Sequence, residues 1–213
     1  MERRIISLGD QVFERLENDI LSGKYERGTV TSELKLCAEL GVSRTPVREA
    51  LGRLSAEHLI EETGKGILIL GITKEDLKDC MEVRVRLDGL SAARCAKAIT
   101  EEQLKQLSET LELQEFYQSK NDSDRVKAMD SRFHELIYLF SGSMVFYEVL
   151  APLHKKVQRY RKAALETTGR APKSIAEHRA IYEAIAAHDA EGAKNAMLLH
   201  AQNAKESLLA AVK

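Results

Sequence analysis

Tryptophan is absent from this chain of 213 residues, and aromatic residues make up only 5% of it. Leucine, isoleucine, valine and alanine must therefore fill its interior, and the length allows two small domains with a core each. The chain also lacks an excess of positive charge, since its net charge is −1 and residues 1–71 hold 10 Lys and Arg against 12 Asp and Glu. A generic attraction to nucleic acid is thus excluded, and any DNA binding must come from the local placement of charge.

Cysteine and long apolar runs are scarce as well. Cys37, Cys80 and Cys95 form no Cys-x-x-Cys pair, which favours reduced, buried thiols over disulfides or zinc ligands and suits a cytoplasmic protein. The longest nearly apolar run, Ile67–Ile72, is far too short to span a bilayer, and the N-terminus leads into no long apolar stretch. We therefore expect a cytoplasmic protein with no membrane partner.

The most informative segment is GVSRTPVREAL, residues 41–51, which is typical of the turn and second helix of a helix-turn-helix. Gly41 suits the left-handed position just past a preceding short helix. Ser43 or Thr45 can cap the next helix, and Pro46 fits its first turn, where a missing N–H breaks no intrahelical bond. The segment predicts two short helices joined by a tight turn.

The second of these helices has one apolar and one polar face. The apolar positions, spaced as on one side of a helix, are Val47, Ala50, Leu51 and Leu54. Arg44 and Arg48 lie near the N-terminal end, which is the part of a recognition helix that enters the major groove of DNA. From spacing alone, an ordinary amphipathic helix pair with solvated arginines is the alternative.

The segments around the helix pair support DNA binding. Residues 59–63 and 67–70 have the character of two short strands, and the glycine-rich turn 64–66 joins them. A first helix ahead of the pair is expected to end at Gly23. A β-hairpin that directly follows a recognition helix makes a winged helix.

Residues 8–72 resemble the winged-helix domain of the GntR family of bacterial transcription regulators, and SRTPVREAL is close to the signature of that family. The resemblance implies operator DNA as the partner. It places the DNA contacts at Ser43, Arg44, Thr45, Arg48, Lys65 and Gly66, the last two at the wing tip. The family often has a basic residue after the glutamate of the second helix, whereas Leu34 follows Glu33 here, so operator preference can differ from the family norm.

From residue 72 onward the sequence predicts only helices. Their expected ranges are 74–98, 101–119, 123–141, 143–167, 173–188 and 190–211. Short turns between helices favour an antiparallel bundle. We therefore expect a mainly α chain: a winged helix-turn-helix with a small β-hairpin in residues 1–72, and an antiparallel bundle of about six helices in residues 73–213.

Candidate chemistry in the second domain concentrates on histidines. Asp130 and His134 lie four residues apart, so their side chains emerge from one face of a helix. With His178 and His200 on later helices, they form an oxygen and nitrogen donor set that suits Zn²⁺, and also Ni²⁺, Mn²⁺ or Co²⁺. The other three histidines, His58, His154 and His188, show no such partner in the sequence. A chance pair with a structural role is the alternative.

Residues 75–211 resemble the effector-binding FCD domain of the FadR branch of the same family. The resemblance implies a divalent metal on Asp130, His134, His178 and His200, with zinc favoured on ligand type. It also implies that Arg84 faces the cavity beside the metal, where it would hold the carboxylate of an effector. An ordinary charged helix surface is the alternative for Arg84. Ser141-Gly142-Ser143 stands where the family often has an asparagine.

The sequence thus predicts a DNA-binding transcription regulator that acts as a homodimer and is no enzyme. Its operator affinity would be controlled by a small carboxylic acid bound beside a divalent metal. Two alternatives remain open at this stage. One is a metal-responsive regulator without an organic effector, and the other is a helical metalloenzyme, against which no residue stands out as a general base.

Overall fold

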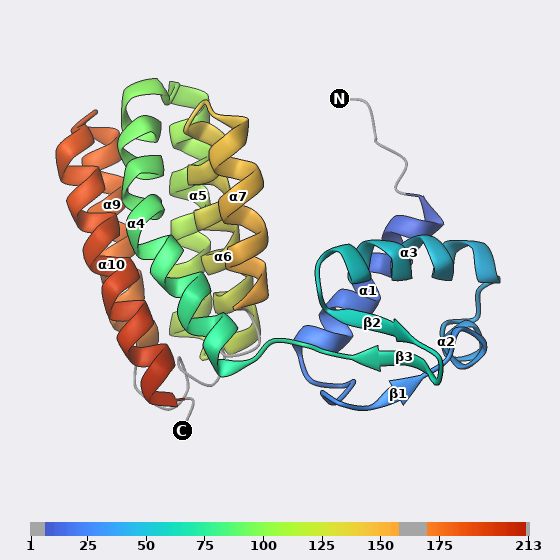
Figure 1. Ribbon diagram of the computed structural model, residues 1–213. Coiled ribbons are helices and arrows are strands. Elements are labelled where there is room, and N and C mark those ends of the chain that lie inside the picture. The colour runs from blue at the N-terminus through green and yellow to red at the C-terminus, as the bar shows by residue number, and fades with distance from the viewer. Residues whose placement is uncertain (1–6, 158–169, 212–213) are drawn as a thin grey trace. The chain divides into compact units, whose positions relative to one another are not determined.

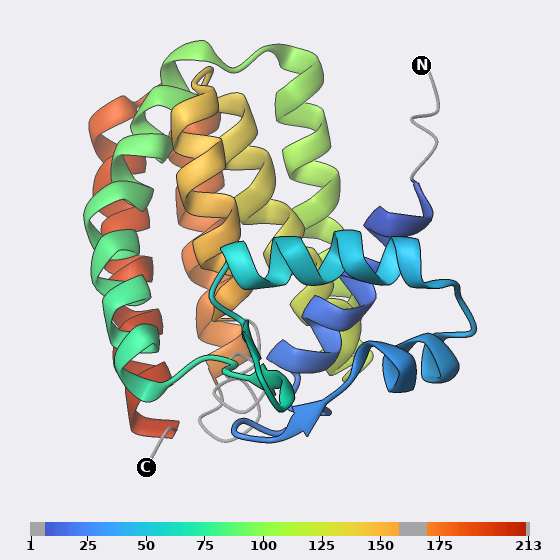
Figure 2. The ribbon, with the colours of Figure 1, turned by 45° about the vertical axis from the view of Figure 1, so that its right-hand side comes forward.

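The computed structural model describes residues 7–157 and 170–211, and the chain divides into two compact units, Met1–Thr73 and Lys74–Lys213. The first unit combines short helices with a small sheet, and the second consists of upright helices side by side (Figure 1, Figure 2). This arrangement confirms the mainly α fold class, with a winged helix-turn-helix followed by a helical bundle.

The first unit contains three helices and three strands within its described residues. In chain order they are α1 (Leu8–Leu21), β1 (Val30–Thr31), α2 (Glu33–Leu40), α3 (Arg44–Ala56), β2 (Ile60–Thr63) and β3 (Gly66–Ile69). The sheet is antiparallel in the order β1-β3-β2, with Val30 opposite Leu68 and Ile60 opposite Ile69. Its core gathers the apolar faces of α1 and α3, which pack against each other.

Local sequence signals account for the helix ends in this unit. The Ser32 hydroxyl accepts a hydrogen bond from the Lys35 backbone N–H and caps α2, and Gly41 ends that helix with φ of 68°. Ser43 is the N-cap residue of α3. Strand β1 was not expected, because two residues are too short to show an alternating pattern, and the wing strands begin or end one residue away from their predicted bounds.

The second unit is an antiparallel bundle. Its described helices are α4 (Lys74–Ala98), α5 (Glu101–Ser119), α6 (Ser123–Phe140), α7 (Met144–Lys156), α9 (Arg170–Ala186) and α10 (Ala190–Ala211). Helix α4 packs against α10 and α7, and α5 packs against α6 and α9. The fully buried side chains of the bundle core include Leu107, Leu111, Phe133, Leu136 and Ile137. Burying each side chain of this size contributes about 1.5–3 kcal/mol.

Two predicted helix ranges need correction. The helix expected over 143–167 is α7, which ends at Lys156, and the part of the expected range beyond residue 157 lies outside the described residues. The helix expected to begin at residue 173 begins at Arg170 instead. Pro172 lies in the first turn of this helix, where a proline leaves the intrahelical hydrogen bonds intact and so marks no boundary.

Candidate functional site

The exposed face at the start of α3 carries the predicted DNA-contacting side chains. Ser43, Arg44, Thr45 and Arg48 are exposed, whereas Val47 on the opposite face is fully buried. Within the described residues the Ser43 side chain makes no capping hydrogen bond, so its hydroxyl serves no helix donor. Backbone N–H groups at this helix start and the two guanidinium groups together form a surface suited to phosphates and base edges.

A carboxylate from α2 holds both arginines. The Arg48 Nε lies 2.7 Å from Glu33 Oε2, and the Arg44 Nε lies 3.4 Å from Glu33 Oε1. Leu34, the next residue along, has 62% of its surface exposed. Glu33 thus fixes where the two guanidinium groups lie, and the neighbouring position offers an apolar side chain instead of a further positive charge.

The wing tip lies between β2 and β3. Lys65 is exposed there, and its backbone N–H donates to the Thr63 hydroxyl at 3.2 Å. Gly66 has φ of 128°, and a Cβ at that position would lie 2.5 Å from the Thr31 carbonyl oxygen. Arg48 and Gly66 line the same groove. The recognition helix and the wing therefore lie next to one another. Position 66 requires glycine, because its φ is positive and a Cβ would clash with the Thr31 backbone.

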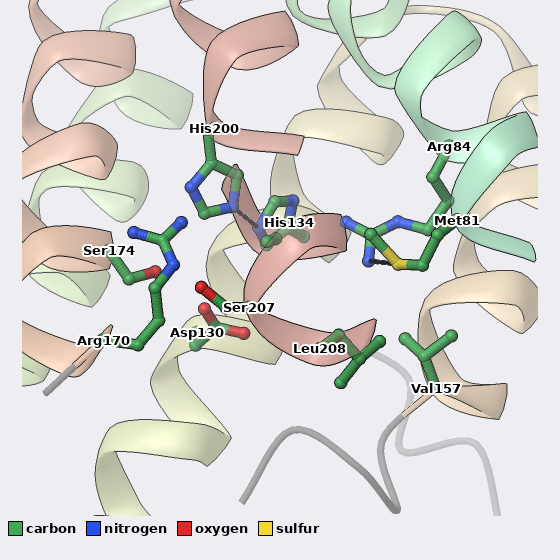
Figure 3. A pocket seen from close by; sticks show the side chains of 11 residues that line it. Met81, Arg84, Asp130, His134, Val157, Arg170, Ser174, His200, Ser207 and Leu208 are labelled. Carbon is green, nitrogen blue, oxygen red and sulfur yellow. Dashed lines mark hydrogen bonds between the residues drawn. The ribbon is translucent and has the colours of Figure 1, made fainter. Parts of the chain in front are cut away.

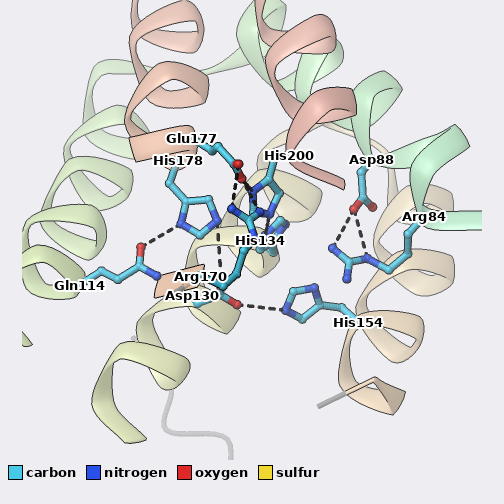
Figure 4. A network of polar contacts seen from close by, with 10 residues as sticks. All are labelled: Arg84, Asp88, Gln114, Asp130, His134, His154, Arg170, Glu177, His178 and His200. Atoms are coloured by element: carbon cyan, nitrogen blue, oxygen red, sulfur yellow. Dashed lines mark hydrogen bonds and ion pairs between the residues drawn. The ribbon is translucent and has the colours of Figure 1, made fainter. Parts of the chain in front are cut away.

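The three predicted ligand histidines meet inside the bundle. His134 on α6, His178 on α9 and His200 on α10 are buried, and one ring nitrogen from each lies within 4.8 Å of the others. The Nε2 atoms of His134 and His200 are 3.1 Å apart. Segments far apart in sequence thus place three imidazoles around one point (Figure 4).

Neighbouring side chains fix the orientation of two of these rings. The Nδ1–H of His178 donates to Gln114 Oε1 at 2.8 Å, and the Nδ1–H of His200 donates to Glu177 Oε2 at 2.7 Å. With the proton on Nδ1, each Nε2 carries a lone pair. Partners of this kind orient histidines that bind metal ions.

Glu177 is itself held firmly. Arg170 donates to both of its carboxylate oxygens, and Asn203 Nδ2 donates to Oε1 at 2.8 Å. Burial raises the pKa of Glu177, but hydrogen bonds from His200, Arg170 and Asn203 outweigh it and hold that pKa at about 2. Glu177 is therefore an anion at neutral pH, and it would strengthen His200 as a ligand for an ion at this site.

Asp130 lies beside the three histidines. Its Oδ1 is 3.6 Å from His178 Nε2, and its Oδ2 is 4.0 Å from Nε2 of a further histidine, His154 on α7. The His154 ring centroid is 4.6 Å from that of His134. The sequence interpretation that gave His154 no partner is therefore wrong, because α7 packs on α6 and brings His154 against the site.

The imidazoles are in the form that binds metal. Burial lowers the pKa of His134 and of His154 well below the usual value, and for His134 the neighbouring His154 and His200 lower it further. Burial also lowers the pKa of His200, against the opposing effect of Glu177. Neutral imidazoles offer a lone pair at neutral pH, as metal binding requires.

A small cavity of about 50 Å³ adjoins the histidines. Figure 3 shows the guanidinium groups of Arg84 and Arg170 on opposite sides of His134 and His200. The rest of the lining mixes the Asp130 carboxylate and serine hydroxyls with apolar side chains of Met81, Val157, Ala204 and Leu208. A water molecule needs roughly 10–15 Å³ of such volume, so the cavity has room for only a few atoms of a ligand.

Arg84 lies in this lining and is already paired. Its Nε and Nη2 donate to Asp88 Oδ2 at 3.1 and 2.8 Å, and the Tyr138 hydroxyl donates to Asp88 Oδ1 at 3.0 Å. Arg84 is 2% exposed and Asp88 is 0% exposed. Burial opposes the charge of Arg84, but Asp88 and Tyr138 raise its pKa, so the guanidinium is charged. The alternative of an ordinary charged helix surface is therefore wrong for Arg84.

The donor set fits a divalent ion. The lone pair of His178 Nε2 faces Asp130 Oδ1, and two acceptors in contact need a cation between them or a proton on one. His134 supports the same conclusion, because its buried Nδ1 has no hydrogen-bond partner among the described residues. Three imidazole nitrogens and one carboxylate are ligands that Zn²⁺, Ni²⁺, Mn²⁺ and Co²⁺ accept.

Comparisons with known proteins agree with this architecture. A family model described as FCD domain matches residues 79–203, and one described as bacterial regulatory proteins, gntR family, matches residues 8–69. Among the described helices, none has the length and apolar character that a membrane crossing requires.

Individual relatives cover the chain to different extents. The gluconate operon transcriptional repressor of Bacillus subtilis (strain 168) is 36% identical over 131 residues, which is 62% of this chain but only 54% of that repressor. This chain therefore spans about half the length of that relative. The HTH-type transcriptional repressor RspR of Escherichia coli (strain K12) is 26% identical over 202 residues, which is 94% of this chain and 89% of that protein. The structure of E. coli McbR/YncC has the same fold, with a TM-score of 0.83 at 23% identity over 98% of this chain and 100% of that one.

Proposed function

The chain belongs to the GntR family of bacterial transcription regulators with an FCD domain, and from this premise we propose that it is a homodimer whose affinity for operator DNA is set by a small carboxylic acid. The acid would bind beside a divalent metal in the helical unit. Because the family consists of transcription regulators, the helical metalloenzyme is set aside.

One observation carries the proposal: Asp130, His134 and His200 line the same cavity as the buried, charged Arg84. An ion held by Asp130, His134, His178 and His200 that accepts six ligands keeps two positions for an acid. Arg84 lies in the lining of the same cavity, and its Nη1, which does not bond Asp88, contacts the Sδ of Met81, another lining residue, at 3.8 Å. A carboxylate or hydroxy-carboxylate would therefore meet positive charge at both ends.

The cavity also limits the size and character of the acid. Its volume of about 50 Å³ excludes long chains, and its apolar side chains favour a short aliphatic body between polar ends. Zinc is the metal that we favour on ligand type, although the same donors accept Ni²⁺, Mn²⁺ and Co²⁺.

DNA binding is assigned to the exposed face of α3 and to the wing tip at Lys65 and Gly66. Two copies of the chain would present two such faces to the half-sites of an operator, which is how helix-turn-helix dimers read DNA. Large apolar side chains exposed on α7, among them Val145 at 70% and Met144 at 59%, are available for contact with a second copy. Analytical ultracentrifugation of the purified protein tests whether it is a dimer in solution.

Arg48→Ala is expected to weaken operator binding by about 1–3 kcal/mol, because the variant loses a guanidinium at the start of the recognition helix. Fluorescence anisotropy with DNA that the wild-type protein selects from a random pool measures the change. Arg53→Ala is the matched control, since Arg53 lies on the same helix but pairs with Asp10 and stacks on Phe13. Equal losses in both variants would mean that only general charge matters and that α3 does not read the operator.

An acid that binds one conformation of the bundle better is expected to change operator affinity by roughly 5- to 150-fold. By linkage, operator DNA must change the affinity for the acid by the same factor. A screen of short mono-, hydroxy- and dicarboxylic acids by thermal shift, followed by DNA titrations with and without chelator, measures both. If metal alone alters operator affinity and no acid does, the regulator responds to the metal itself.

A variant without charge at the Arg84 position sharpens this test. Arg84→Met combined with Asp88→Leu and Tyr138→Phe removes the guanidinium and leaves neither a buried carboxylate nor a hydroxyl without its partner. This charge-free variant should keep DNA binding and metal content but lose the response to the acid. A full response would remove Arg84 from the acid site.

A further inference from the structure

His154 is the buried histidine that the proposed ligand set does not use. It lies on α7 with 5% of its surface exposed, and its Nε2 is 4.0 Å from Asp130 Oδ2. Figure 4 shows its ring directed at this oxygen, on the side of Asp130 away from His178. The groups that this ring contacts matter, because burying a polar group without a hydrogen bond costs free energy.

The two oxygens of Asp130 face different groups. Oδ1 faces His178 Nε2 at 3.6 Å, and that nitrogen carries a lone pair because its Nδ1–H donates to Gln114. Oδ1 and His178 Nε2 therefore both offer electron pairs toward the place of the ion. Oδ2 faces the ring nitrogen of His154, which can carry a proton.

Two of the other proposed ligands, His178 and His200, show the same arrangement. His178 is oriented by Gln114 and His200 is oriented by Glu177, each through the ring atom that points away from the ion. His154 lies in the corresponding place relative to Asp130, behind the oxygen that does not face the histidines. Carboxylates that bind metal ions are themselves commonly held by a hydrogen bond of this kind.

We propose that His154 is a positioning residue for the metal: when an ion is bound, its Nε2–H closes the 4.0 Å gap to Asp130 Oδ2, donates a hydrogen bond to it and so keeps Oδ1 directed at the ion. The proposal rests on the metal site proposed above. Without this donor the carboxylate turns more freely about its side-chain bonds, and an ion loses a preorganised ligand. Loss of a partner of this type typically lowers metal affinity by roughly 10- to 100-fold.

Two substitutions at one position separate hydrogen bonding from packing. His154→Gln can carry an amide N–H close to the position of the imidazole Nε2–H, whereas His154→Leu fills similar space without a donor. Asp130→Ala removes the ligand itself. His188→Gln is the matched control, because His188 bonds the Ala96 carbonyl outside the site.

The measurements are the affinity for Zn²⁺, from competition with a chelator, and the visible absorption spectrum of the Co²⁺ form, which reports ligand number and geometry. We expect His154→Leu to lose roughly 10- to 100-fold in affinity and to shift the Co²⁺ spectrum toward that of Asp130→Ala. His154→Gln should recover most of both properties, and His188→Gln should match the wild type.

Three results would overturn the inference, and they differ from one another. If His154→Leu keeps the wild-type Zn²⁺ affinity and Co²⁺ spectrum while Asp130→Ala clearly loses affinity, the role of His154 is rejected and the metal site is retained. Equal losses in His154→Leu and His154→Gln would show that only packing matters. Absence of metal binding by the wild-type protein would reject the metal site and this inference together.

Discussion

Replacement of Asp88 by asparagine is expected to lower the free energy of unfolding of the helical unit by about 3–5 kcal/mol, because it leaves a buried guanidinium without a counter-ion. Asp88 accepts two hydrogen bonds from Arg84 and one from Tyr138, and it is fully buried. The asparagine keeps the shape of the side chain, but it removes the charge and replaces one of the two accepting oxygens by an NH2 donor. Urea denaturation followed by circular dichroism measures the loss.

Two controls identify the source of this effect. Glu191→Gln breaks the exposed pair of Glu191 with Lys194, and a surface pair contributes at most about 1 kcal/mol. The charge-free variant should recover most of the stability that Asp88→Asn loses, since an apolar replacement of a buried ion pair is often neutral. If Asp88→Asn lowers the free energy of unfolding by less than Glu191→Gln does, Asp88 does not neutralise Arg84.

His134→Ala is expected to abolish stoichiometric metal content, because it removes the imidazole at the centre of the cluster. His134 lies between His154 and His200, with an Nε2 to Nε2 distance of 3.1 Å to the latter. An ion that binds only the folded state raises the free energy of unfolding by about 4 kcal/mol when its free concentration is about 1,000 times its Kd. The variant should melt at or below the temperature of wild-type protein treated with chelator, because alanine also leaves a space where the buried imidazole packed. Elemental analysis of protein purified without an affinity tag measures the metal.

His58→Asn is the control for this variant. His58 lies in the first unit with φ of 57°, a conformation that asparagine tolerates. Metal content and the stabilising effect of metal should both be unchanged in His58→Asn. If washed wild-type protein carries no divalent metal and none raises its melting temperature, the histidines serve packing alone.

Sequence reasoning found the elements whose signals are local. The helix-turn-helix was predictable because Ser32, Gly41 and Ser43 mark helix ends within a few residues of one another. Asp130 and His134 could be paired because four residues on one helix fix their side-by-side position. The later histidines were matched through family resemblance, and the structure places all of them at one point.

Residues that act across helices could not be found in this way. Gln114 and Glu177 bond His178 and His200 only because α5, α9 and α10 pack together, and no spacing in the sequence records that contact. His154 was set aside for the same reason. Asp88 stands four residues after Arg84, so the pair itself was visible, but its burial depends on how α4 meets its neighbours.

The hold of Glu33 on Arg44 and Arg48 has a consequence for how such a regulator finds one site in a chromosome. A genome offers about 10⁶–10⁹ competing sites, and affinity for all of them comes from basic side chains facing phosphates. Here a carboxylate of the protein already neutralises part of that charge, so if Arg44 and Arg48 contact DNA as proposed, random DNA would gain less from each encounter, whereas the operator would add base contacts. The protein would then spend less time on wrong sequences, and occupancy of the operator would depend on the ratio of its specific to its non-specific affinity.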